Sequence, residues 1–179
     1  MGTKCKFVNG KQVFSSDAMF VSAGKITSNQ QVVSSTTETA LVSETIYGKT
    51  LNSAGMHFRV TIAGEISSTG TGDCTFTLRY GTTDILALAT VTLANEDDKQ
   101  FKLEFIGRVH TVGASGKVVA SARLDVEQTT AMLFVADTAV AGATVDTTAD
   151  GSLNVSAHWD ASSADNDVIA TIGFIELFS

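Results

Sequence analysis

The chain has 179 residues, of which 44% are hydrophobic and 17% charged, and its formal net charge is −7. This length and composition indicate one globular domain that can bury a core without disulfides or metals. The acidic balance argues against nucleic acid or an anionic membrane surface as partner, because both attract clustered Lys and Arg. The sequence has two isolated cysteines, Cys5 and Cys74, with neither a disulfide framework nor a zinc spacing, so a reducing compartment is expected. No signal peptide or transmembrane run is expected.

The first 38 residues differ from the rest of the chain. Asn9-Gly10 predicts a small hairpin over Lys6–Phe14, because Asn-Gly favours positive φ. Residues 22–38 are dominated by Ser, Thr, Gln and Gly and have little apolar surface to bury. We interpret residues 1–38 as an extended N-terminal arm ordered by another chain, with a disordered tail as the alternative. Removing residues 1–34 is then expected to leave a folded domain.

Residues 39–179 show the alternation of apolar and polar side chains that is typical of half-buried strands. In the hairpin from Gly55 to Tyr80, Phe58, Val60 and Ile62 share one parity while Arg59 and Thr61 share the other. The polar, glycine-rich connection between its two runs lets the chain reverse. Strands are predicted over residues 39–46, 55–67, 74–80, 85–93, 101–112, 118–126, 152–160 and 168–178. Thr129–Thr148 is ambiguous and fits a short strand or a long loop.

The fold class predicted from these segments is all-β, an antiparallel β-sandwich with about eight strands. No stretch long enough to form a helix has apolar residues at the helical spacing i, i+3, i+4, i+7. A sandwich of this size is either jelly-roll-like or immunoglobulin-like. This sequence lacks the Cys…Trp…Cys arrangement that is typical of immunoglobulin domains. Residues 39–179 are therefore predicted to form one jelly-roll-like domain.

Three histidines, His57, His110 and His158, lie on the polar parity of their strands. One sheet face could gather them into a metal site, but their spacing is looser than that of known metal motifs, which favours solvated side chains. Arg59 and Arg108 share the parity of His57 and His110 and are likewise interpreted as solvated side chains on an outer face.

The acidic loop contains Asp160, Asp165 and Asp167, and oxygen-rich loops of this kind can hold calcium. The EF-hand pattern is absent, so a solvated turn is favoured, and Asp146 and Asp150 are interpreted in the same way. The acidic run Glu96-Asp97-Asp98 is interpreted as a hairpin tip.

No catalytic motif is found. Gly70-Thr71-Gly72 joins two antiparallel strands and precedes no helix, so it is not a phosphate loop. No Gly-x-Ser-x-Gly elbow is present, and nothing nominates a pair of catalytic carboxylates. No catalytic, cofactor-binding or metal-binding residue is predicted, and the chain is not expected to be an enzyme.

The order of several short motifs resembles the small virion proteins of tailed bacteriophages. The motifs are Ser35-Thr36-Thr37-Glu38-Thr39, Gly55, Leu78-Arg79-Tyr80-Gly81, the strand Phe101–Gly107, Gly113-Ala114-Ser115-Gly116, Asp146-Thr147-Thr148, Leu153–Trp159 and Ile175-Glu176-Leu177. The resemblance implies a non-enzymatic, homotrimeric decoration (cement) protein that binds the major capsid protein on the virion surface. The resemblance implies no cofactor, and neither nucleic acid nor a membrane as a binding partner. The alternative is a tail fibre or spike module that reads host carbohydrate, although Trp159 falls on an inward parity.

The C-terminal segment Val168–Phe178 does not alternate cleanly, because apolar residues occupy both parities. Val168, Ala170 and Ile172 lie on one parity, and Ile175 lies on the other. The second face needs a cover, and a neighbouring copy is the predicted one. The alternative is a cover formed by residues 129–148 of the same chain. Ile175→Asp is the substitution that this parity suggests for testing self-association.

Overall fold

A computed structural model describes residues 4–8, 11–15, 21–48, 50–68, 72–93, 95–128 and 132–178, and their side chains from residue 25 onward except 89–92 and 133. All regular elements in these ranges are β-strands. None of the described segments forms a helix that could span a membrane. The predicted all-β, antiparallel sandwich is confirmed.

The larger of the two packed sheets, called the large sheet below, is antiparallel and follows the order β11-β10-β9-β6-β13. Two short strands, β3 and β4, then pair with successive stretches of the far edge of β13. The bounds are β3 (Val21–Lys25), β4 (Gln30–Val33), β6 (His57–Ser68), β9 (Glu96–Thr111), β10 (Gly116–Glu127), β11 (Met132–Val145) and β13 (Asp167–Phe178).

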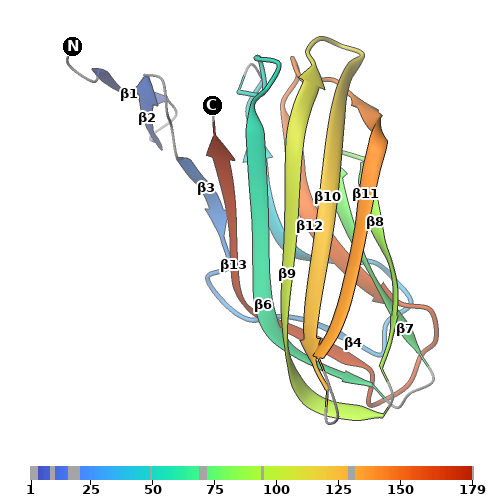
Figure 1. Cartoon of the computed structure of the whole chain (residues 1–179). Helices are drawn as coiled ribbons and strands as arrows, with labels where there is room; N and C mark the ends of the chain where they lie inside the picture. Colours follow the sequence, from blue (N-terminus) through green and yellow to red (C-terminus); the bar gives the residue numbers. More distant parts are fainter. Residues whose placement is uncertain are drawn as a thin grey trace.

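The small sheet has four strands in the order β5-β12-β7-β8, also antiparallel. The bounds are β5 (Thr39–Ile46), β7 (Asp73–Tyr80), β8 (Thr83–Thr92) and β12 (Gly151–Trp159). Figure 1 shows the large sheet in front with the small sheet behind it, so that the chain forms two layers.

The strand order gives the connectivity. Apart from β3, β10 and β11, the sheets read β4-β13-β6-β9 and β5-β12-β7-β8, so the chain repeatedly crosses from one sheet to the other. We infer from this order the paired Greek keys of a jelly roll. The hairpin β10–β11 is an addition that widens the large sheet beyond β9.

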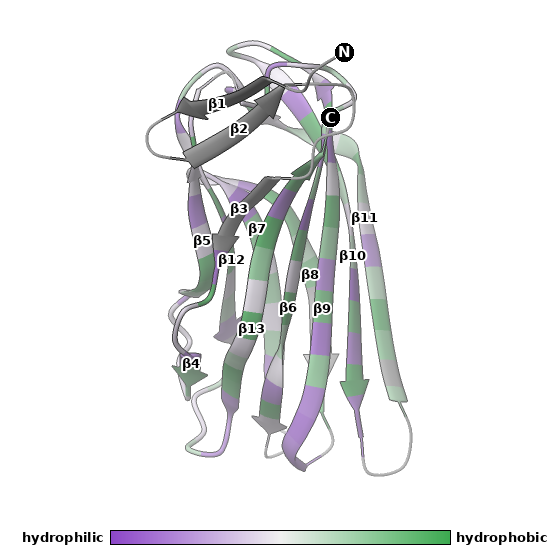
Figure 2. Ribbon diagram, turned by 90° about the vertical axis from the view of Figure 1, so that its left-hand side faces the viewer, coloured by the Kyte–Doolittle hydropathy of each residue, from purple (hydrophilic) through white to green (hydrophobic). Residues whose placement is uncertain are grey.

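The core lies between the two sheets and is built from the inward parity of each strand. Trp159, Phe76 and Phe105 are among its largest fully buried side chains. The rings of Phe76 on β7 and Phe101 on β9 approach to 5.8 Å between centroids and so join the two sheets. Gly107 is needed in this core, because a Cβ there would lie 2.0 Å from Cζ of Phe58. The alternation that predicted these strands is visible along β9 in Figure 2.

The segment expected to be an N-terminal arm contributes directly to the large sheet. β4 pairs with β13, with Val32 opposite Val168, and Val32 is 1% exposed within the core. Two strands, β1 (Lys4–Val8) and β2 (Lys11–Ser15), form the hairpin predicted near the N-terminus. Its expected turn at residues 9–10 lies outside the described residues. The neighbour that orders residues 21–33 is therefore β13 of the same chain.

The ambiguous segment from residue 129 to 148 contains a long strand, β11, paired with β10. It lies at the edge of the large sheet opposite to β3 and β4 (Figure 1). The alternative in which this segment covers β13 is therefore wrong.

A β-bulge explains why β13 is apolar on both parities. Its register with β6 shifts between Ala170 and Ile172, which adds one residue to β13. Val168 and Ala170 face the core before the bulge, whereas Ile175 and Leu177 do so after it. The expectation that Ile175 lies on a second face that another copy must cover is thus wrong, because the bulge turns this residue into the core of its own chain.

Candidate functional site

The outer face of the large sheet consists of the side chains that point away from the small sheet. The strand registers arrange them in rows that cross β13, β6, β9, β10 and β11. Each row is listed here in the strand order just given. The first row, which has no β11 member, holds Phe178, His57, Arg108 and Val119, and the second holds Glu176, Arg59, Ile106, Ser121 and Thr138. The third row holds Phe174, Thr61, Glu104, Arg123 and Ala136, and the fourth holds Ile172, Ala63, Lys102, Asp125 and Phe134.

The centre of this face neutralises its own charges. Arg59 lies 3.7 Å from Glu104 and 3.6 Å from Glu176, measured from guanidinium nitrogen to carboxylate oxygen. Nε of Arg123 donates to Asp125 over 2.7 Å. The Arg59–Glu104 and Arg123–Asp125 pairs are partly exposed and contribute little to stability, whereas Glu176 is buried. They leave the centre of the face without a net charge that would attract a partner.

The two flanks of the face are apolar. Ile172 on β13 is 58% exposed, and Phe134 and Val140 on β11 are 59% and 80% exposed. Arg123 lies over the ring of Phe134, with Cζ 5.4 Å from the ring centroid, which is cation–π geometry. Ile172 and the two β11 residues lie at opposite edges of the face, with β6, β9 and β10 between them, so each flank offers its own exposed apolar side chains for contact with a partner.

A hollow of about 380 Å³ lies where the first two rows meet β11. Its lining combines basic side chains (Arg108, with His57 and His110), hydroxyls (Ser121, Thr138) and apolar groups (Ile106, Val119, Ala120, Val140, Ala141), with Gly107. It is called the cationic hollow below after Arg108, and no described carboxylate lines it. Among the described residues, its three basic side chains make no hydrogen bond or ion pair. The hollow therefore offers positive charge beside exposed apolar surface.

The structure separates the three histidines. His57 and His110 both line the cationic hollow, whereas His158 lies on the small sheet, with its Nδ1 buried and without a hydrogen-bond partner. No group of three or more His, Cys, Asp or Glu in the described part of the chain is placed to share a metal ion. Arg59 and Arg108 both lie on the outer face of the large sheet, as the parity of their strands predicted for each of them.

The carboxylates of the loop between β12 and β13 bond to their own chain. Asp160 accepts a hydrogen bond from the backbone amide of Asp73 over 2.8 Å. Asp167 accepts one from Nε2 of Gln31 over 2.7 Å, which ties the loop to β4. Asp165 is exposed. These carboxylates do not converge on a common point.

The loop before β12 closes on itself in the same way. Asp146 accepts hydrogen bonds from Oγ1 and the amide of Thr148 over 2.6 and 2.8 Å, and these bonds lower the pKa of its carboxyl group. Asp150 accepts one from the amide of Gly48. Burial, followed by the charges of Asp150 and Asp146, raises the pKa of Tyr80.

A polar tie crosses the outer face of the small sheet and was not predicted. Arg79 on β7 forms ion pairs with Glu38 and Asp84, and Glu38 also accepts a hydrogen bond from Ser156 over 2.7 Å. These bonds raise the pKa of Arg79, with the hydrogen bond to Asp84 as the largest cause. These bonds hold Glu38, which precedes β5, against β12 and β7, so their side chains cover part of the outer face of the small sheet.

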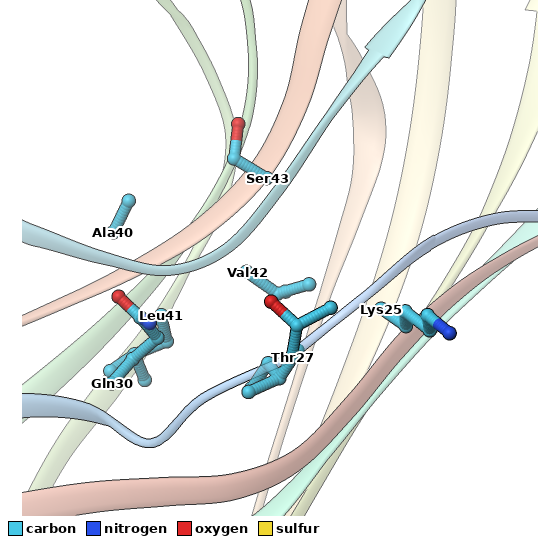
Figure 3. Close-up of a pocket in the computed structure, with 8 residues that line it drawn as sticks. Lys25, Thr27, Gln30, Ala40, Leu41, Val42 and Ser43 are labelled. Atoms are coloured by element: carbon cyan, nitrogen blue, oxygen red, sulfur yellow. The ribbon is translucent and has the colours of Figure 1, made fainter.

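A second hollow, of about 240 Å³, lies between residues 25–30 and β5. Figure 3 shows Gln30 beside Leu41, with Thr27 near Val42. Leu41 and Val42 are buried, so they offer a ligand little apolar surface. This hollow marks where the chain crosses from β3 to β4 along the edge of the sandwich.

The thiol of Cys74 should not react in the native protein. Cys74 is 0% exposed, and burial raises the pKa of its thiol well above the usual range. In a Cys5→Ser variant, labelling with an aromatic disulfide reagent should proceed only as denaturant unfolds the chain. Rapid, stoichiometric labelling without denaturant would contradict the position of Cys74 in the core.

Comparisons with known proteins give one structural likeness. No family model and no curated protein matches the sequence. The chain is similar to a solved structure described as the CBM2 module of Lactobacillus casei BL23 phage J-1 evolved Dit, with 11% identity, 98% of this chain and 79% of that chain covered, and a TM-score of 0.37. At this TM-score the likeness carries no weight, and the fold is assigned from the sheet order alone.

Proposed function

We propose that this chain is a non-enzymatic structural protein of a tailed-phage virion. Its most specific form is a homotrimeric decoration protein that binds and stabilises the major capsid shell at the virion surface. The order of sequence motifs supports the class of protein. The observation that supports a contact role is the outer face of the large sheet, with its apolar flanks and cationic hollow.

The chemistry of this face suits binding better than catalysis. A catalytic centre brings a nucleophile within hydrogen-bond reach of a base that a third group orients. The cationic hollow holds two histidines and the hydroxyls of Ser121 and Thr138, but no hydrogen bond joins either hydroxyl to His57 or His110 among the described residues. We therefore assign the hollow to recognition of a partner surface.

Rebinding to particles tests this proposal. Purified protein should attach to virions that lack it, and Ile172→Asp and Phe134→Asp should attach much more weakly, because both place a charge on the apolar flanks. Thr45→Asp, at an exposed position on the small sheet, is the matched control and should attach as the wild type does. Equal attachment of all four proteins would contradict a role for this face.

A second candidate function is carbohydrate recognition by a tail fibre or spike. The exposed ring of Phe134 favours it, because the polar side chains of Arg123, Asp125 and Lys102 lie nearby and could bind hydroxyls. The burial of Trp159 removes the aromatic side chain best suited to stacking on a sugar. A glycan array would distinguish the candidates: reproducible binding to one sugar class, lost in Phe134→Ala, would favour the second.

A further inference from the structure

The large sheet ends in an open edge at β11. This strand pairs with β10, and none of the described strands pairs with its other side. Its register with β10 is regular from Met132 to Ala139, and within this stretch Met132, Phe134 and residues 136–138 are exposed. An edge strand presents a row of unpaired backbone N–H and C=O groups, which a further strand can bind.

This edge has few of the features by which proteins block the pairing of edge strands. The stretch Met132–Ala139 contains neither lysine nor proline, and its one charged residue is Asp137. The other edge of the same sheet is closed by β3 and β4. In the small sheet, β5 lies beside β3 and β4, and β8 packs against β11. Among the described strands, β11 is therefore the one most open to an added strand.

The N-terminal hairpin β1–β2 has no strand partner in its own sandwich. It forms a separate two-stranded sheet and pairs with no other described strand. Its strands, Lys-Cys-Lys-Phe-Val and Lys-Gln-Val-Phe-Ser, include two phenylalanines and two valines. A lone hairpin is at best marginally stable in water and needs a third strand or a packing surface. The hairpin thus requires what the edge of β11 offers.

The hairpin cannot reach β11 of its own chain. The strand that follows it, β3, stands at the far end of the order β11-β10-β9-β6-β13-β3. A strand added beyond β11 would lie about six strand spacings, or about 29 Å, from β3. The chain from Ser15 to Val21 spans at most about 22 Å when fully extended. A hairpin that pairs with β11 must therefore come from another molecule.

We infer that the hairpin β1–β2 of one copy adds to the edge of β11 in a second copy and extends its large sheet by two strands. Backbone hydrogen bonds hold an added strand of this kind, and alternate side chains supply the specificity. On the outer face the added strand lies beside Met132 and Phe134, which are 49% and 59% exposed without it. Burial of these two side chains contributes to the contact.

The contact is heterologous, because each copy gives its hairpin and receives another at β11. Such contacts close into rings when the rotation permits and otherwise extend into filaments. This inference rests on the proposed function and deepens it, since a trimeric ring requires a heterologous contact. The strands β3 and β4 stay with β13 of their own chain, so the hairpin alone is exchanged.

A full-length variant can disable the hairpin. Val13→Pro removes a backbone amide from β2, where Val13 stands opposite Lys6 of β1, and proline is poorly tolerated within a strand. Val13→Thr is the matched control, because it keeps the amide and a β-branched side chain. Both changes lie outside the two packed sheets, so circular dichroism should show a folded sandwich in each protein.

A second full-length variant can block the edge. Ala136→Lys with Thr138→Lys places two charges at exposed positions of β11, as natural edge strands do to prevent pairing. The matched control is Ala40→Lys with Thr45→Lys, which adds the same charge at exposed positions of β5, an edge strand of the small sheet. All four residues are exposed, so both proteins should remain folded.

Sedimentation equilibrium of the purified full-length proteins at micromolar concentration measures assembly. The wild type and the two controls should assemble, and the hairpin variant and the edge variant should each assemble at least tenfold more weakly. When these two variants are mixed, the intact hairpin of one meets the intact β11 of the other. A one-to-one heterodimer should form and extend no further, since its remaining hairpin and edge are both disabled.

Three results would overturn the inference: a monomeric wild type, a hairpin or edge variant that assembles as its control does, or a mixture that stays monomeric. Particle binding separates this failure from failure of the proposed function. A monomer that still decorates virions would remove the hairpin exchange and keep the virion role. An assembly that depends on the hairpin but binds no particle would do the reverse.

Discussion

Removing residues 1–20 should leave the unfolding temperature of the sandwich nearly unchanged, whereas removing residues 1–34 should lower it sharply or prevent folding. The longer deletion removes β3 and β4 and leaves the edge of β13 without its partners. It also takes Val32 out of the core, and burial of such a side chain contributes about 1.5–3 kcal/mol. In a chain of this length each 1 kcal/mol shifts the unfolding temperature by about 2–4 °C.

Two neighbouring residues provide a matched control that keeps the chain length constant. Val32 is 1% exposed and Val33 is 47% exposed, on adjacent positions of β4. Val32→Asp should destabilise the protein by several kcal/mol, because it buries a charge without a partner, and Val33→Asp should have little effect. Thermal melts followed by circular dichroism measure both. Equal melting of the two truncated proteins would show that residues 21–34 are not part of the sandwich.

Ile175→Asp should unfold the domain, whereas Ile172→Asp should leave it folded. The bulge in β13 turns Ile175 into the core at 0% exposure and Ile172 outward at 58%. A buried unpaired carboxylate costs about 4 kcal/mol or more, while an exposed substitution stays within about 0.5 kcal/mol.

Urea titration of both variants checks this expectation through the unfolding midpoint. The outcome also decides how self-association through β13 can be tested: light scattering is informative with Ile172→Asp, whose fold persists. A stable Ile175→Asp with an unfolded Ile172→Asp would place the bulge elsewhere and reverse the assignment of the two faces.

The alternation of side chains predicted most of the sandwich, since a strand with one buried and one solvated face has apolar and polar residues in turn. It worked for β6, where inward Phe58 and Val60 alternate with outward Arg59. It failed for β11, an edge strand that is exposed along much of its length and so has no sharp apolar parity. It could not locate the bulge in β13. Odd and even positions are both apolar before and after Thr171, so the switch of the buried side from one parity to the other cannot be seen in the sequence.

The short strand β4 was assigned to an arm for a related reason. Gln30-Gln31-Val32-Val33 contributes one buried side chain, and its stability comes from backbone pairing with a distant strand. The tie between Glu38, Arg79 and Asp84 likewise depends on the sheet order. Pairing of strands far apart in sequence is set by the whole fold and leaves no local pattern.

The candidate site was predicted only in part. Parity placed His57, Arg59, Arg108 and His110 on outer faces, which the structure confirms for one face of the large sheet. Parity could not show that His57 stands opposite Arg108, because register across a sheet is not encoded within either strand. The contribution of Val140 required the position of β11.

The virion role is tested most directly by locating the protein on intact particles. Cryo-electron microscopy of virions, with the sandwich fitted into the density, should show clusters of three copies on the head surface. In these clusters the outer face of the large sheet should meet neighbouring protein. Absence of the sandwich from purified particles, or its presence solely on the tail fibres, would contradict the decoration assignment.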